Sequence, residues 1–263
     1  MPIPPDSYFV RADERRFLPT ERTGGGWDPG EQHISPMNGL VVHEVERLVA
    51  ARPDDGLQVG RISVDILGVL PLQEFEIAVE VLRPGRTIEL LEATVTSGGR
   101  AAVRTRVWRM ATGDTAAVAG GAPVPLPRPE DAAPWAMTDL WPGGFIASLD
   151  VRTTAPPVPG RTTAWIRSDV PLLPDEPVSD LARFVGFVDT MNGIAVRESP
   201  EAWMFPNLDL TIHLSRGPQG PWAGLDTAVV FGEGGLGVTS AVLHDERGAV
   251  GYAAQTLTVR PRT

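Results

Sequence analysis

Two polar side chains interrupt apolar patterns in the second half of the chain. A helix is predicted over 178–192, and Asp189 falls on the flank of its apolar face, beside Val185. A strand is predicted near the end of the chain, where Gln255 shares the core-facing side with Leu257. A carboxylate can accept a proton and an amide can hold a water molecule, so these residue types suit general-base hydrolysis. The alternative is structural: a rim contact for Asp189 and a backbone hydrogen bond for Gln255.

The two halves of the sequence follow one plan, and this favours the functional interpretation. At the positions expected to correspond to Asp189 and Gln255, the first half carries Arg47 (or a neighbour) and Val107. Polar residues that served the fold would be expected in both copies, but only one copy has them. Because an arginine and a valine cannot take a proton and hold a water, the sequence predicts one site per chain.

Other motifs that suggest chemistry have simpler explanations. Residues 232–237 match G-x-G-x-x-G, but the following segment alternates and is β-branched, so a hairpin turn is predicted instead of a dinucleotide site. His43 and Glu44 resemble half of a zinc-protease motif, but Arg47 stands where the second histidine is needed. With four scattered histidines and no cysteine, no metal and no cofactor are predicted.

The composition limits the class of protein. The 263 residues are 42% hydrophobic and 21% charged, which is typical of a globular protein with one large or two small domains. All 23 basic residues are arginine, and the formal net charge of −10 disfavours binding to nucleic acid or to an anionic membrane. No secretory signal and no apolar stretch of about 18 residues occurs, so a soluble cytoplasmic protein is expected.

Each half is predicted to hold one helix followed by a meander of strands. The first helix is predicted over Ser35–Arg52, with Ser35 as its N-cap and Pro36 in its first turn. The second is predicted over Val178–Asn192 and ends at Gly193. The predicted strands are Arg61–Leu70, Glu74–Arg83, Arg86–Ser97 and Arg100–Met110 in the first half, and Asn207–Ser215, Leu225–Phe231, Leu236–Asp245 and Ala249–Arg260 in the second.

A segment rich in proline, glycine and alanine separates the halves. It predicts a linker at 113–134 between an N-terminal domain at 1–112 and a C-terminal domain at 135–263. A single helix buries its apolar face only when a curved sheet covers it, which indicates the α+β class. We therefore expect two antiparallel sheets, each wrapped around a central helix, and expect them to join edge to edge because open sheet edges are otherwise unpaired.

A set of segments occurs in a characteristic order along the chain. They are Asn38–Val41, Arg61–Leu67, Val79–Arg86 and Ala101–Trp108 in the first half, and Phe187–Asp189, Pro206–Leu214 and Tyr252–Gln255 in the second. In order and spacing they resemble the tandem hotdog thioesterases, the family that includes bacterial acyl-CoA thioesterase II. The resemblance covers nearly the whole chain and implies a double hotdog fold with a site at the seam between the two halves.

The resemblance also implies roles for individual residues. In the family a helix Asp, a Ser or Thr at the start of the next strand and a Gln in the last strand hold the attacking water; here these are Asp189, Asn207 and Gln255. Asn207 departs from the usual hydroxyl, although an amide can both donate and accept. Asp209 is a second candidate for the base if the alignment shifts along the strand.

The oxyanion donors are expected at the start of the first helix. The backbone around Asn38 and Gly39 is the candidate substrate-binding element, because a helix N-terminus offers unpaired N–H groups. Relatives usually carry Gly-Gly at this place. For Gly39 the alternative is close packing of the helix.

The implied function is hydrolysis of an acyl-CoA or similar thioester by water. A non-catalytic acyl-thioester-binding protein is one alternative. A hydratase or dehydratase is another, and it would need an Asp/His pair, which no histidine forms with Asp189 in a known signature. Arg260 and Arg262 are interpreted as solvated arginines in preference to ligands of CoA phosphates. Acyl-CoA is the expected partner; nucleic acid and membrane are not, and exposed sheet faces suggest a homodimer.

Overall fold

The computed structural model describes residues 6–262, and a large antiparallel sheet forms most of its framework. Its 13 strands in sheet order are β1 (Phe9–Arg11), β2 (Arg16–Pro19), β4 (Phe75–Arg83), β5 (Ile88–Ser97), β6 (Arg100–Ala111), β3 (Leu57–Ile66), β11 (Asp209–Leu214), β14 (Gly248–Thr258), β13 (Leu236–Asp245), β12 (Ala223–Phe231), β9 (Arg161–Ser168), β8 (Leu149–Thr153) and β7 (Ala133–Pro134). Two short strands, β10 (Trp203–Met204) and β15 (Arg260–Pro261), pair separately. The helices are α1 (Ile34–Ala50), α2 (Gly144–Ala147), α3 (Asp180–Val188) and α4 (Met191–Ile194).

The two halves of the chain meet in the middle of this sheet. Strand β3 of the first half pairs with β11 of the second, and Ile62 faces Ile212 across the junction. The halves therefore do join edge to edge, and the result is one continuous hydrogen-bonded sheet where we expected two sheets. Because β3 and β11 are edge strands of their own halves, this pairing satisfies backbone groups that would otherwise be open.

Both predicted helices are present with different ends. Helix α1 begins at Ile34, and its N-cap is His33, whose Nδ1 accepts a hydrogen bond from the N–H of Ser35. Ser35 and Pro36 thus lie inside the first turn, where a proline costs nothing because the first N–H groups have no partner within the helix. Helix α3 is capped by Ser179, and the chain turns at Asp189 before the short α4.

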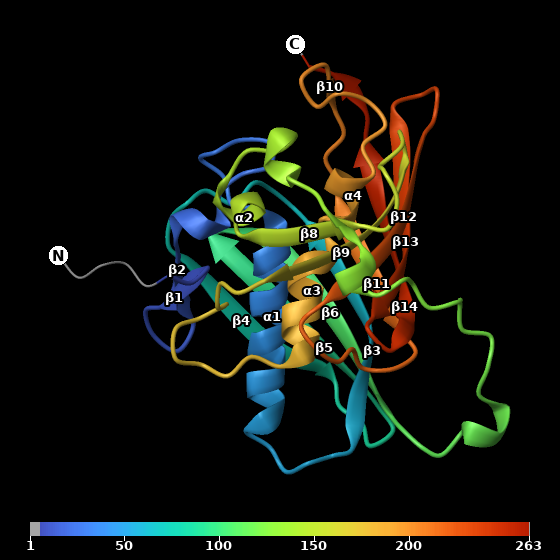
Figure 1. Ribbon diagram of the computed structural model, residues 1–263. Coiled ribbons are helices and arrows are strands. Elements are labelled where there is room, and N and C mark those ends of the chain that lie inside the picture. Colours follow the sequence, from blue (N-terminus) through green and yellow to red (C-terminus); the bar gives the residue numbers. More distant parts are fainter. Residues whose placement is uncertain (1–5, 263) are drawn as a thin grey trace.

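Helices α1 and α3 lie side by side in the middle of the molecule (Figure 1). Their crossing depends on two glycines that face each other. A Cβ added to Gly39 would lie 2.9 Å from the carbonyl oxygen of Ala182 and 3.1 Å from Cα of Gly186. A Cβ added to Gly186 would lie 3.7 Å from Cα of Gly39 and 3.8 Å from the carbonyl oxygen of Ser35. The two helices are therefore related by a local pseudo-twofold axis at this crossing, with Gly39 matching Gly186.

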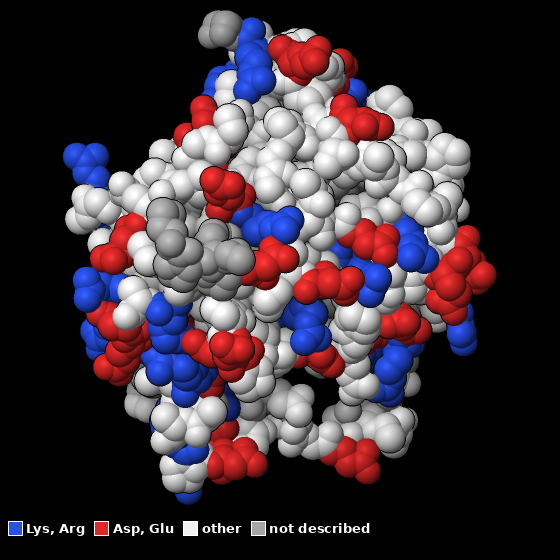
Figure 2. Space-filling view, turned by 60° about the vertical axis from the view of Figure 1, so that its left-hand side comes forward, with Lys and Arg blue, Asp and Glu red and all other residues white. Residues whose placement is uncertain are grey.

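The strand predictions hold with shifted ends, and the glycine motif at 232–237 is the turn of the β12–β13 hairpin. The segment after β6 loops away from the body of the molecule (Figure 1) before β7 joins the edge of the sheet. Acidic and basic side chains are interspersed over the face shown in Figure 2, which has no large basic patch. Among residues 6–262, no helix is long and apolar enough to span a membrane.

Candidate active site

The structure brings Asp189, Asn207 and Gln255 together from three elements. Asp189 caps the C-terminus of α3, Asn207 precedes β11, and Gln255 lies on the inner face of β14. Oδ1 of Asp189 accepts one hydrogen bond from Nδ2 of Asn207 and one from Nε2 of Gln255, each at 2.7 Å. Asp189 is 4% exposed and Gln255 is 2% exposed. The two residues that break the apolar pattern thus contact each other, and Asn207 joins them.

Burial sets the electrostatics of this carboxylate. Removal from water raises the pKa of Asp189 to about 6, and the hydrogen bonds from Asn207 and Gln255 lower the pKa only in part. Oδ2 of Asp189 forms no hydrogen bond within the described residues, so one oxygen is held by amides and the other is free to accept a proton. A carboxylate with a pKa near neutrality is suited to general-base catalysis.

Asp189 and Asn207 border a cavity at the seam between the halves. The main cavity has a volume of about 570 Å³. It is lined by the segment that leads into α1, by the loop that follows β3, by residues 204–208 and by Arg260 and Arg262. A smaller recess of about 40 Å³ adjoins it and is lined by Asp189, Asn207 and His33 among others. That volume is sufficient for a water molecule. Gln255 lies behind Asp189 and does not line either space.

The predicted substrate-binding pair Asn38 and Gly39 is misplaced. The N-cap is His33, two residues before the predicted Ser35, so both residues lie in the second turn of the helix, away from the cavity, and Gly39 serves the contact with α3. His33 and Ile34 occupy the helix N-terminus at the cavity wall instead. Histidine is an uncommon N-cap, which is why Ser35 was the stronger signal in the sequence.

The second candidate base, Asp209, is committed elsewhere. Its Oδ1 accepts a hydrogen bond of 2.6 Å from the backbone N–H of Thr256 on β14, and it does not line the cavity. Its main-chain oxygen accepts a hydrogen bond from Asn207 Nδ2 at 3.1 Å. Asp209 therefore orients Asn207 and β14, and Asp189 is the carboxylate at the recess.

The β5–β6 and β13–β14 hairpins show which strand positions correspond between the halves. The turn pair Ser97–Arg100 of β5–β6 corresponds to the turn pair Asp245–Gly248 of β13–β14, because the register shifts at Val95/Thr96 and Leu243/His244 lie equally far from them. Val107 and Gln255 lie equally far along the second strand of these two hairpins, so Val107 corresponds to Gln255, as the sequence indicates. By the helix crossing, Asp189 corresponds to Val42, not to Arg47. Ser63 and Thr211, which pair across the β3–β11 junction, correspond to each other, so Asn207 corresponds to Val59.

The corresponding residues of the first half are three valines, and Arg109 lies two residues beyond Val107 on β6. Arg109 is 4% exposed and pairs with Asp55 at 2.6 Å and with Glu89 at 2.7 Å. A cavity of about 380 Å³ lies beside it, bordered by Leu57. Val42 is buried and apolar. The first half therefore has a similar hollow but no carboxylate and amide arranged as in the second half.

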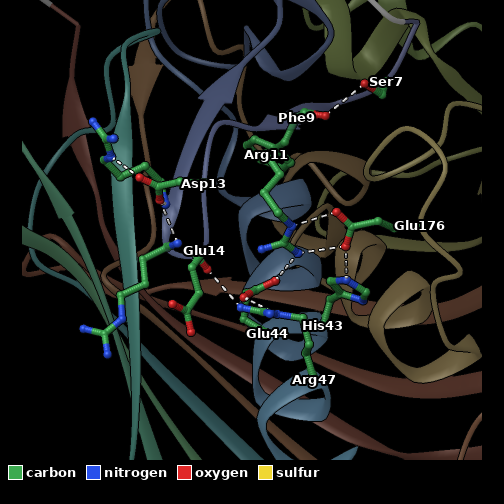
Figure 3. A network of polar contacts seen from close by, with 11 residues as sticks. Ser7, Phe9, Arg11, Asp13, Glu14, His43, Glu44, Arg47 and Glu176 are labelled. Atoms are coloured by element: carbon green, nitrogen blue, oxygen red, sulfur yellow. Dashed lines mark hydrogen bonds and ion pairs between the residues drawn. The ribbon is translucent and has the colours of Figure 1, made fainter. Parts of the chain in front are cut away.

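His43 and Glu44 belong to a network of ion pairs and hydrogen bonds (Figure 3). Arg11 donates to Glu44 at 2.6 Å and to Glu176 at 2.7 Å, and Nε2 of His43 lies 3.1 Å from Glu176. The network joins the N-terminal segment, α1 and the loop before α3. Across residues 6–262, no group of three or more His, Cys, Asp or Glu side chains is arranged to hold a metal ion.

Sequence comparison matches both halves of the chain to one family. Residues 23–110 match the family model of the acyl-CoA thioesterase N-terminal domain, and residues 129–259 match that of the C-terminal domain. The comparison with curated proteins gives no match.

Solved structures with a similar fold cover nearly the whole chain. An acyl-CoA thioesterase II from Mycobacterium marinum is 16% identical, with a TM-score of 0.65 over 97% of this chain and 96% of that one. The tesB protein of Mycobacterium avium subsp. paratuberculosis is 19% identical, with a TM-score of 0.67 over 96% of each chain. A hotdog-fold protein from Alicyclobacillus acidocaldarius is 12% identical, with a TM-score of 0.75 over 98% of each.

At these identities the structural likeness shows the hotdog fold, and the family models give the relationship. Both models fall in the expected order, and together they span most of the sequence. The chain belongs to the acyl-CoA thioesterase family whose members combine an N-terminal and a C-terminal hotdog domain.

Proposed function

We propose that the protein hydrolyses acyl-CoA thioesters with Asp189 as the general base. The observation that supports this proposal is the environment of the Asp189 carboxylate. The carboxylate is buried, and its Oδ1 accepts hydrogen bonds from two amides while its Oδ2 accepts none. Asp189 also borders a recess that can hold water. The proposed architecture is a double hotdog in which each half of the sheet curves around one helix, with domains at 1–112 and 135–263 joined by 113–134.

In the proposed reaction, a water in the recess attacks the thioester carbonyl carbon. Oδ2 of Asp189 takes a proton from this water as the new C–O bond forms. The tetrahedral intermediate then breaks its C–S bond, and the CoA sulfur leaves with the proton returned by Asp189. Asn207 fixes the carboxylate from the side of the recess, and Gln255 positions it from behind. A thioester needs no covalent enzyme intermediate for this route.

The oxyanion is proposed to form near the N-terminus of α1. Ile34 is the first residue of that helix and lines the cavity, so its N–H has no partner within the helix. The positive end of the helix dipole points toward the same space. Preorganised donors of this kind stabilise the charge that develops on the carbonyl oxygen.

The cavity is also suited to the head group of CoA. Its volume lies within the range typical of small-molecule sites. Arg260 and Arg262 line it and form no salt bridge within residues 6–262, in contrast to most arginines of this chain. This favours a role in binding phosphate over the sequence interpretation of plain solvated side chains.

A hydratase is the second candidate, because His33 shares the recess with Asp189 and supplies the Asp/His pair that such chemistry needs. However, Nδ1 of His33 accepts the N–H of Ser35, so the imidazole lone pair is engaged and no histidine base faces the recess. A non-catalytic acyl-binding protein would have the same cavity without turnover.

Release of free CoA thiol from a panel of acyl-CoAs tests these functions. We expect turnover by the wild type and a loss of about 10²–10⁴-fold in kcat in Asp189→Asn, which keeps the volume and removes the base. Binding without turnover would support the non-catalytic function. Hydration of 2-enoyl-CoA without thiol release would support the hydratase.

A further inference from the structure

His33 caps helix α1 with one ring nitrogen and leaves the other ring nitrogen without a hydrogen-bond partner within residues 6–262. Its Nδ1 accepts the N–H of Ser35 at 3.1 Å, and its ring packs on Phe145 with centroids 4.6 Å apart. Both contacts fix the orientation of the imidazole. The other nitrogen, Nε2, forms no hydrogen bond within residues 6–262 and is not among the fully buried polar atoms. It therefore remains accessible from the cavity that His33 lines.

The space beside Nε2 is kept open by a glycine. A Cβ added to Gly26 would lie 3.3 Å from Cδ2 of His33 and 4.0 Å from Nε2. Gly26 and His33 both line the recess that also contains Asp189 and Asn207. A small group held in this recess thus lies between the Asp189 carboxylate and the imidazole edge.

The protonation of His33 follows from its contacts. Because Nδ1 accepts a hydrogen bond, the proton of the neutral ring is on Nε2, which makes Nε2 a donor. Burial lowers the pKa of His33 to about 4, so the ring is neutral at physiological pH. The helix N-terminus at which it lies also disfavours a positive ring. The charged groups that line the same cavity are Asp28, Glu31, Asp189, Arg260 and Arg262.

We propose that His33 is a second catalytic residue, whose Nε2–H donates a hydrogen bond to the carbonyl oxygen of the thioester. This rests on the proposed thioesterase function. As water attacks, the carbonyl oxygen gains negative charge while Nε2 keeps its proton, and the proton of the water goes to Asp189. His33 transfers no proton at any step. A neutral imidazole at a helix N-terminus is a known type of electrophile for a carbonyl group.

Two substitutions separate the donor from the cap. His33→Asn leaves a side-chain oxygen that can accept the N–H of Ser35, because asparagine is a good N-cap, but it removes the group at Nε2. His33→Gln places an amide nitrogen near the position of Nε2 and gives up the cap. We expect kcat to fall by about 10²–10³-fold in His33→Asn with KM and Tm little changed. In His33→Gln we expect a lower Tm but a smaller loss of kcat. Exposed His213→Asn is the control and keeps wild-type activity.

The pH profile and the bound carbonyl give further readouts. Since His33 donates without titrating, the acid limb of kcat/KM is expected at the same pH in His33→Asn as in the wild type. A thioester labelled with ¹³C at the carbonyl and bound to Asp189→Asn should show a lowered C=O stretch, and adding His33→Asn should remove most of that lowering.

Two results would overturn the proposal. One is an unchanged carbonyl stretch on adding His33→Asn; the other is a loss of kcat in both variants in proportion to their loss of Tm, as a purely structural role requires. If the wild type does not hydrolyse thioesters but lowers the C=O stretch through His33, the thioesterase proposal fails and the donor assignment stands.

Discussion

Asp189 combines two conditions that a base needs at neutral pH. Its burial raises the pKa to about 6, and its amide partners keep the carboxylate in one orientation. Above this pH the group is deprotonated and can accept a proton. We therefore expect kcat/KM to rise with pH through about 6 and then level off, as measured by thiol release at saturating and limiting substrate.

Asn207 provides a matched test of that assignment. Its hydrogen bond to the ionised carboxylate lowers the pKa of Asp189, so Asn207→Ala is expected to move the acid limb to higher pH. If the acid limb of kcat/KM stays at the same pH in Asn207→Ala, a group other than Asp189 determines that limb.

The same burial has a cost for stability. The folded pKa of Asp189, about 6, lies above the unfolded value near 3.9, so the native state holds the proton more tightly. The resulting decrease in the free energy of unfolding is absent below about pH 4, grows as the pH rises and reaches its full size above about pH 6. Asp189→Asn removes it, and we expect a gain of up to about 3 kcal/mol at pH 8 and none at pH 4. Denaturant unfolding at both pH values measures this. A loss of stability at pH 8 would contradict the prediction.

At the residue scale, the site residues that could be predicted from the sequence are those that interrupt an apolar pattern. Asp189 and Gln255 stand out because apolar neighbours surround them, and the structure shows that they contact each other. The prediction that Asn38 and Gly39 lie at the helix N-terminus was wrong, because it took Ser35 as the N-cap, whereas His33 is the N-cap. A histidine side chain that replaces a standard cap carries no sequence signal of its own.

At the scale of elements, the α1–α3 crossing controls the site, since α1 supplies His33 and α3 supplies Asp189. A methyl group on Gly39 would press on the backbone of α3 at 2.9 Å, whereas one on Gly186 would meet ordinary contacts at 3.7 Å. Gly39→Ala is therefore expected to cost about 1–3 kcal/mol and to lower kcat as the helices separate. Gly186→Ala is expected to be neutral or stabilising, because alanine favours helix.

Thermal unfolding and thiol release on both glycine variants provide the comparison. If Gly39→Ala and Gly186→Ala changed Tm and kcat equally, the predicted difference between the two variants would be wrong. A stable Gly39→Ala protein with wild-type kcat would show that the crossing does not control the site.

Arg260 in strand β15 and Arg262 directly after that strand both line the cavity. If they bind the phosphates of CoA, the double variant Arg260→Ala/Arg262→Ala should raise KM for acyl-CoA by about 10-fold with little change in kcat. An acyl-pantetheine substrate, which lacks the nucleotide, should be unaffected. Arg86→Ala, at an exposed hairpin, is the control. Equal KM effects on both substrates would exclude phosphate recognition.

The elements themselves were largely predictable, because alternation and turn residues mark the long strands. The short strands β1 and β2 were not predicted, since so few residues carry no clear period. The predicted ends of α3 also included Asp189 and Asn192, where the chain in fact turns into α4.

At the scale of the whole molecule, one sheet runs through both halves and a pseudo-twofold axis passes between Ser63 and Thr211. The sequence indicates the duplication and the match of Val107 with Gln255, and the hairpin registers agree with that match. The match of Asp189 with Val42 follows only from the helix crossing, because the sequence does not show how the two helices pack. The prediction of one site per chain stands, because Val42, Val59 and Val107 cannot act as a base with an amide partner.

We therefore expect one active site per chain, in which the second half supplies Asp189 and the first half supplies the N-terminus of α1. Titration with a non-hydrolysable acyl-CoA analogue should give one tight site per chain. Gln255→Ala should abolish most activity, because the carboxylate loses one of its two amide donors. Val107→Ala should cost about 1–3 kcal/mol of stability with kcat nearly unchanged, since Val107 is a core residue away from the site. Two equivalent tight sites, or half of the activity remaining in Asp189→Asn, would instead place a second working site in the first half of the chain.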